Sequence, residues 1–95
     1  MFHINVWLTV NDPANTAKVR ELLAQACQLS RAESGCLRFE VFHSQSDPQK
    51  FLLCERWESE QAWKDHRNEK AFTEIYQPQV LPLVDREPHI SDVVE

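Results

Sequence analysis

Residues 36–57 read CLRFEVFHSQSDPQKFLLCERW, and this stretch decides the fold. Two strand-like segments, 36–43 and 51–57, lie on either side of residues 45–50, where Ser-Asp-Pro is typical of a turn. The first segment alternates between two faces, whereas the second is apolar on both. Because so short a connection joins antiparallel neighbours, the stretch predicts a β-hairpin in the middle of the chain.

Before the hairpin, the sequence predicts a strand and then a helix. Residues 2–10 alternate with period two, which predicts a strand with one apolar face. Asp12-Pro13 predicts a helix start, and apolar residues recur at helical spacing from Val19 onward. We expect this helix to end at Ser34-Gly35, because glycine adopts the left-handed conformation freely.

After the hairpin, the sequence predicts more helix and a last strand. Ser59 is a suitable N-cap for a short helix over roughly residues 60–69. A further helical stretch with Phe72, Ile75, Tyr76 and Val80 contains Pro78, where we expect a kink or a break. Residues 89–94 predict a weak fourth strand.

The order of these elements is strand, helix, strand, strand, helix, strand. It predicts an α+β fold of the ferredoxin-like βαββαβ type, a single domain over residues 1–95 with an antiparallel four-stranded sheet ordered 4-1-3-2. The helices can cover only one face, and the predicted strands place apolar side chains on the other: Trp7, Phe42, Leu52 and Cys54. We therefore expect a homodimer joined through that face.

Composition excludes several classes of protein. The net charge is -5 and no basic cluster is present, which argues against nucleic acid as a partner. No apolar run approaches the ~20 residues of a membrane span, and the N-terminus lacks the pattern of a signal peptide. One glycine excludes a Gly-rich phosphate loop, and four scattered histidines argue against a zinc site. Three widely spaced cysteines indicate reduced thiols and a cytoplasmic location.

Two motifs connect the chain to a known family. Glu33-Ser-Gly-Cys-Leu-Arg-Phe39 is followed by Glu55-Arg-Trp-Glu-Ser59, and then by Ala62, His66 and Phe72. Over about residues 2–94, this order and spacing resemble the antibiotic biosynthesis monooxygenase (ABM) family. The resemblance implies a dimeric α/β barrel with a ligand cavity between sheet and helices in each subunit. Its members include cofactor-independent quinol and anthrone monooxygenases, an enzyme acting on a phosphorylated autoinducer, and haem-degrading relatives.

Three residues are candidates for catalysis. His66 falls on the buried stripe of its helix. It is either a general base or a structural histidine held by a hydrogen bond to a carbonyl or carboxylate. Glu55 lies mid-strand among large apolar groups, where it could orient His66 or accept from a substrate hydroxyl. The structural alternative for Glu55 is an ion pair with Arg38 or Arg56, or exposure at a dimer seam.

Tyr76, ten positions after His66, bears on the haem question. The resemblance implies that the haem-degrading branch would need Trp at position 66 and His at position 76, so haem is disfavoured. Tyr76 is expected to pack its ring in the core and donate its hydroxyl. In that branch a first-strand asparagine also reaches the pocket, and Asn5 is offset from it by one. The predicted substrate-binding residues are Asn5, Phe39, Trp57, Trp63 and Phe72.

These patterns and the resemblance lead to one functional hypothesis and one alternative. The first is a cofactor-independent monooxygenase, using no metal, flavin or haem, that oxidises a small aromatic or enediol-type substrate with dioxygen. In this scheme His66 removes a proton and the substrate itself supplies the electrons. The alternative is a non-oxidative ligand-binding or isomerase-like protein on the same dimeric barrel.

Overall fold

A computed structural model describes all residues from 1 to 95. The strands are β1 (Phe2–Val10), β2 (Cys36–His43), β3 (Lys50–Trp57) and β4 (Val84–Ser91). The helices are α1 (Thr16–Arg31), α2 (Glu60–His66) and the π-helix η2 (Ala71–Val80), with short 3₁₀ turns at Pro13–Asn15 and Leu81–Leu83. None of the helices combines the length and the apolar character needed to cross a membrane.

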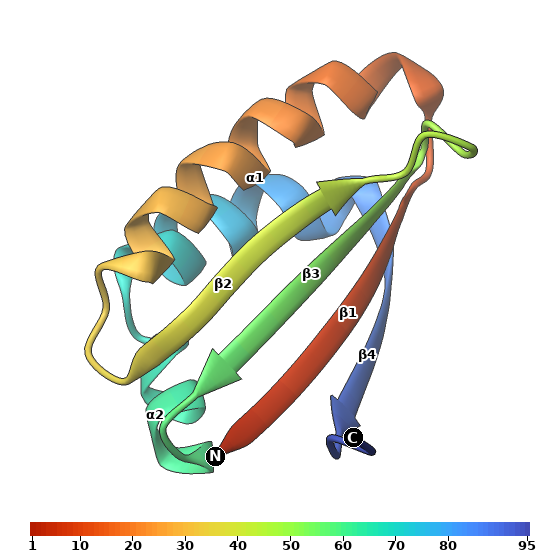
Figure 1. Ribbon diagram of the computed structural model, residues 1–95. Coiled ribbons are helices and arrows are strands. Elements are labelled where there is room, and N and C mark those ends of the chain that lie inside the picture. The colour runs from red at the N-terminus through yellow and green to blue at the C-terminus, as the bar shows by residue number, and fades with distance from the viewer.

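The four strands form one sheet in the order β2-β3-β1-β4, and every neighbouring pair is antiparallel. This confirms the predicted ferredoxin-like α+β fold and the central hairpin of β2 and β3. Figure 1 shows α1 across one face of the sheet, with η2 in light blue beside it. The opposite face carries no helix.

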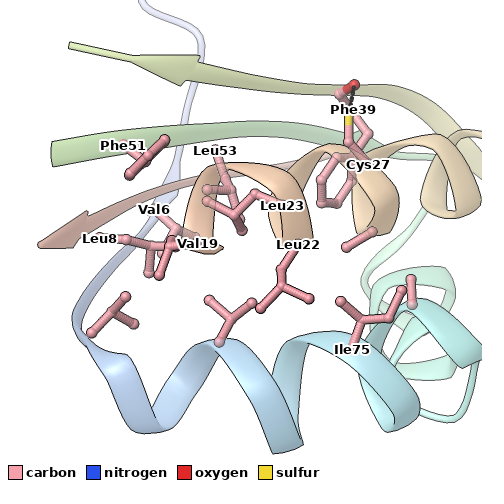
Figure 2. Packing of buried hydrophobic residues seen from close by; sticks show 14 of the residues in the cluster. Val6, Leu8, Val19, Leu22, Leu23, Cys27, Phe39, Phe51, Leu53 and Ile75 are labelled. Carbon is pink, nitrogen blue, oxygen red and sulfur yellow. Dashed lines mark hydrogen bonds between the residues drawn. The ribbon is translucent and has the colours of Figure 1, made fainter. Parts of the chain in front are cut away.

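The core fills the space between the sheet, α1 and η2. In β1 the residues alternate, so that Val6 and Leu8 are buried under the helices while Trp7 points to the other face. Figure 2 shows strand side chains such as Leu53 packing towards Leu23 of α1, with Ile75 of η2 closing the cluster. Burial of this apolar surface is the main contribution to the stability of the fold.

The first helix follows its predicted start but not its predicted end. The Asp12 carboxylate accepts from the Ala14 amide at 2.9 Å and so caps the 3₁₀ turn Pro13–Asn15, from which α1 continues at Thr16. The helix ends at Arg31, earlier than predicted. The amides that follow donate to carbonyls three residues back instead of four, as the Glu33 amide does to Ser30 O. Gly35 does adopt a left-handed φ of 82°, but within the loop to β2.

The second helical region also differs from its prediction. Ser59 caps α2 as expected, accepting from the Ala62 amide at 3.1 Å, but α2 ends at His66. The expected break at Pro78 is absent, because η2 is wound as a π-helix through it. In an α-helix the amide of residue 78 would donate to Glu74 O, but proline has no N–H. The side chain of Gln79 donates to this carbonyl instead, from Nε2 at 2.9 Å.

Two strand assignments need correction. The fourth strand is Val84–Ser91, not 89–94: it pairs with β1 along its length as an edge strand, where Pro88 is tolerated and no apolar alternation reveals it. Strict alternation in residues 36–43 would put Leu37 on the apolar side with Phe39, but a bulge between Cys36 and Arg38 leaves it exposed.

The uncovered face carries the predicted apolar side chains among polar ones. Trp7 is 39% exposed and Phe42 45%, and Leu52 lies between them in the strand register. Cys54 lies in the next row of the same face. A row of large apolar side chains on a face without helices is thus the main surface feature of this chain.

Candidate active site

A cavity opens on the helix-covered side of the sheet. The space inside it that the centre of a water molecule can reach is about 40 Å³, and it opens to solvent. Its apolar wall is formed by residues of the sheet, α1, α2 and η2, among them Leu23, Phe39, Leu53, Trp63 and Phe72. A largely apolar wall with a few polar groups is the usual character of a small-molecule site.

Most of the predicted site residues meet at this cavity. Six of them line it: Phe39, Glu55, Trp63, His66, Phe72 and Tyr76. Trp57 does not line it, because its side chain is wholly buried behind Glu55. Asn5 was predicted to contact substrate, but it alternates with the inward-facing Ile4 and Val6 and so lies on the opposite face of the sheet. There its Nδ2 donates to Ser91 Oγ at 3.1 Å.

Glu55 is the buried carboxyl of the cavity, with 8% of the residue exposed. It accepts a hydrogen bond from Trp57 Nε1 at 3.1 Å. The alternative ion pairs with Arg38 or Arg56 do not form, because both arginines point to the other face of the sheet. Burial raises the pKa of Glu55, with the Trp57 hydrogen bond and the nearby His66 and Arg86 charges opposing this. It can therefore hold a proton at a higher pH than an exposed carboxyl.

His66 ends α2 and lies among aromatic rings. Its ring centroid is 4.8 Å from that of Trp57, 5.9 Å from Phe39 and 6.2 Å from Phe72. Its Nδ1 contacts Glu33 Oε1 at 2.5 Å, and both side chains are only 10% exposed. Since Nδ1 is engaged and Nε2 has no partner within the chain, Nε2 is the nitrogen available to a ligand.

The protonation of this pair is governed by burial. Desolvation lowers the pKa of His66, although Glu55 and Glu69 raise it. Desolvation also raises the pKa of Glu33 to about 7, and Glu69 adds to that rise. The state in which Glu33 is ionised and accepts from Nδ1–H leaves a lone pair on His66 Nε2. Once Glu33 is protonated and donates to Nδ1, Nε2 instead carries the proton.

Gly35 makes the Glu33–His66 contact possible. A Cβ at position 35 would lie 2.8 Å from the Ala62 Cβ on α2, closer than Cβ atoms approach. The Gly35 carbonyl also accepts from the Glu58 amide at 2.9 Å, at the start of the connection to α2. The only glycine of the chain therefore lets α2 approach the loop that carries Glu33.

A second polar group reaches the cavity from η2 and β4. Arg86 Nε donates to Tyr76 Oη at 3.2 Å, which leaves the phenol proton of Tyr76 free for another acceptor. Burial raises the pKa of Tyr76, with Arg86 opposing that rise, so the phenol stays protonated at neutral pH. No group of three or more His, Cys, Asp or Glu side chains is arranged to hold a metal ion.

The sequence reasoning missed two of these residues. Glu33 opens the first motif, so its signal was present, but no periodicity indicated that it would meet His66. Arg86 lies in the part of β4 that was not predicted as strand, and its environment has no local signal.

Solved structures resemble this chain over nearly its whole length. An antibiotic biosynthesis monooxygenase of known structure matches with a TM-score of 0.90 at 24% identity, covering 100% of both chains. A protein from Nitrosomonas europaea described under the same family name gives 0.91 at 21% identity, again over 100% of both chains. Another, from Deinococcus radiodurans, gives 0.81 at 26% identity over 98% of this chain and 93% of its own.

Sequence comparison leads to the same family. None of the curated proteins matches the chain. The model of the antibiotic biosynthesis monooxygenase family matches residues 1–78, a span that includes both motifs, His66 and Tyr76. The chain therefore belongs to the antibiotic biosynthesis monooxygenase family.

Proposed function

We propose that this protein is a cofactor-independent monooxygenase that oxidises a small, electron-rich aromatic or enediol substrate in the cavity beside His66. The observation that carries the proposal is the Glu33–His66 pair: Nδ1 is held at 2.5 Å, and Nε2 remains free in the wall of an apolar cavity. Membership of the family supports the general type of reaction.

His66 acts as the general base of the reaction. Burial lowers its pKa, so the ring is neutral near pH 7 and can accept a proton at Nε2. Loss of a hydroxyl proton turns a phenol or an enediol into an anion, which gives up an electron more readily. Phe39 and Phe72, which lie beside His66 and line the cavity, exclude water and hold a flat substrate in place.

The redox step needs only substrate and dioxygen. The substrate anion transfers one electron to O₂, and the resulting substrate radical and superoxide combine through a new C–O bond. Protonation gives a hydroperoxide, whose O–O bond breaks as the C–H proton leaves. The products are a carbonyl, containing one oxygen atom of O₂, and water, containing the other.

Glu55 and Tyr76 supply protons in this scheme. Burial raises the pKa of both groups, which favours their protonated, donating forms. We assign Glu55 as the acid that protonates the departing hydroxide of the hydroperoxide. Tyr76, positioned by Arg86 Nε, donates to an oxygen of the bound substrate.

The same proposal includes a homodimer formed through the uncovered face. Trp7, Leu52 and Phe42 form an adjacent row there. On this face Arg56 Nε is buried without a partner, and a carboxylate of a second copy would satisfy it. We also retain the cytoplasmic location as part of the proposal, which the three free cysteines support.

Oxygen uptake tests this function. The protein is mixed with a panel of quinols and anthrones in the presence of EDTA, and oxygen consumption and ¹⁸O incorporation from ¹⁸O₂ are measured. We expect uptake without added cofactor and one labelled atom in the product. Binding of the same compounds with no oxygen uptake would instead support the non-oxidative alternative.

A further inference from the structure

A second cavity adjoins the first at the edge formed by β4. Its lining consists of Ile4, Trp63, Arg67, Arg86, Pro88 and Ile90. Three of these residues, Trp63, Arg67 and Arg86, also line the cavity beside His66. These three side chains therefore stand where the two cavities meet, and a ligand that extends from one to the other must pass them.

Both arginines at this boundary lack a carboxylate partner. The ion pairs of the chain are Arg38–Glu40, Lys64–Glu60, His66–Glu33 and His89–Glu87. The neighbours of Arg86 along β4, Asp85 and Glu87, alternate to the other face of the sheet. Glu55, the carboxyl on the cavity side, is hydrogen-bonded to Trp57 Nε1 instead.

Each arginine is nevertheless held in place. The Arg67 guanidinium stacks over Trp63, with Cζ 4.2 Å from the ring centroid. Arg86 uses only its Nε–H, which donates to Tyr76 Oη at 3.2 Å. A guanidinium carries five N–H donors, so both forks keep donors free for an acceptor between them.

The charge of this boundary contrasts with that of the whole chain. The net charge is -5, yet two unpaired guanidinium groups stand at the end of the cavity. Such a local reversal of sign attracts and orients an anion. His66 and Arg67 line the same cavity, so a small molecule can contact both the base and the arginine.

We propose that the ligand of this cavity carries an anionic oxygen group, a carboxylate or a phosphate, which binds between Arg67 and Arg86 while its hydroxylated ring or enediol lies beside His66. The proposal deepens the proposed function and depends on it only for the reacting end of the molecule. The anion site itself rests on the two arginines and on the cavity that they share.

Calorimetric titration without turnover tests the anion site. The probes are 4-hydroxybenzoate, its neutral analogue 4-hydroxybenzamide, and phenyl phosphate. We expect the acid to bind roughly 10- to 100-fold more tightly than the amide, the effect of a charge-assisted hydrogen bond. The preferred anion, carboxylate or phosphate, is the one with the lower Kd. Equal affinity for all three probes would overturn the proposal.

Substitutions of single arginines distinguish a specific anion site from a general effect of positive charge. Arg67→Gln should weaken binding of the acid roughly tenfold and leave that of the amide unchanged. Arg86→Gln also removes the hydrogen bond to Tyr76 Oη, so it should weaken binding of both probes, and that of the acid by roughly tenfold more. The matched control is Arg20→Gln on α1, outside both cavities, which should change neither. An equal loss for Arg20→Gln would overturn the proposal. Circular dichroism checks that each variant is folded.

The two proposals can fail separately. Tight, arginine-dependent binding of the acid, with no oxygen uptake on any quinol acid, would leave the anion site standing and retire the monooxygenase. Oxygen uptake on neutral quinols, with no preference for the charged probes, would retire only the anion site.

Discussion

Glu55 and Arg56 are neighbours in β3, yet they lie on opposite faces of the sheet and have different surroundings. Glu55 faces the helices, where it is buried and hydrogen-bonded to Trp57 Nε1. Arg56 faces the uncovered side, where its Nε is buried and has no partner. Glu55 is thus satisfied within one chain, whereas Arg56 Nε is not.

The apolar residues of the two faces show the same difference. Phe39 and Leu53 on the covered side are buried in the core around the cavity. Trp7 and Phe42 on the other side stay more than one-third exposed. In the proposed function, chemistry and association therefore lie on opposite faces of one sheet, and substitutions on each face should have separable effects.

The largest effect is expected from His66→Ala on the covered face. Loss of the general base should reduce turnover roughly 100- to 10,000-fold, with the fold intact. Oxygen uptake and melting temperature are measured on the same preparation, and the exposed His89→Ala serves as the matched control. A lower melting temperature with unchanged uptake per folded molecule would mean that His66 is only structural.

Leu52→Lys tests the uncovered face. An unpaired ammonium buried in an apolar interface costs several kcal/mol, so we expect the dimer Kd to rise roughly 100-fold or more. Light scattering coupled to size exclusion reports the mass at micromolar concentration. Lysine at the exposed Leu37 is the control and should leave the mass unchanged. A monomeric wild-type protein would contradict the assignment of this face to association.

Glu33→Gln tests, on the covered face, whether Glu33 controls the protonation of His66. The wild-type rate should fall as the pH drops below about 7, because the pKa of Glu33 is raised by burial and its protonation moves the proton to His66 Nε2. The Glu33→Gln variant should lose this limb of the pH profile, and its rate at pH 8 should be roughly 10- to 100-fold lower, as for a lost charge-assisted hydrogen bond.

Glu69→Gln is the matched control for the Glu33 prediction. Glu69 raises the pKa values of both Glu33 and His66, so its removal should shift the acid limb to lower pH without abolishing it. A profile that is the same in all three proteins would show that Glu33 does not control the base.

Gly35→Ala has the smallest expected effect. The left-handed φ of 82° costs an alanine roughly 1–2 kcal/mol, and overlap with the Ala62 Cβ adds to this. Chemical denaturation measures the loss of stability, with the exposed Ser34→Ala as the control. Stability equal to that of the wild type would mean that the loop and α2 can separate at little cost.

The sequence alone determined the elements that follow local periodicity. The alternation of residues 2–10, the Asp12 and Ser59 caps and the turn at 45–50 specify most of the elements, and the order of the elements predicts the antiparallel ferredoxin-like sheet. The candidate cavity was predictable in part, because Phe39, Glu55, Trp63 and His66 lie on faces that the periodicity already points inward. The prediction that Asn5 contacts substrate was wrong for the same reason, because the alternation of β1 places Asn5 on the opposite face of the sheet.

Only the tertiary structure decided what pairs with what. Glu33 and His66 are 33 residues apart, and their contact depends on how closely α2 approaches a loop at Gly35. Arg86 reaches Tyr76 because an edge strand without apolar alternation pairs with β1. Local propensity sets the direction of each side chain relative to its own strand or helix, whereas distances between elements depend on packing that no local pattern encodes.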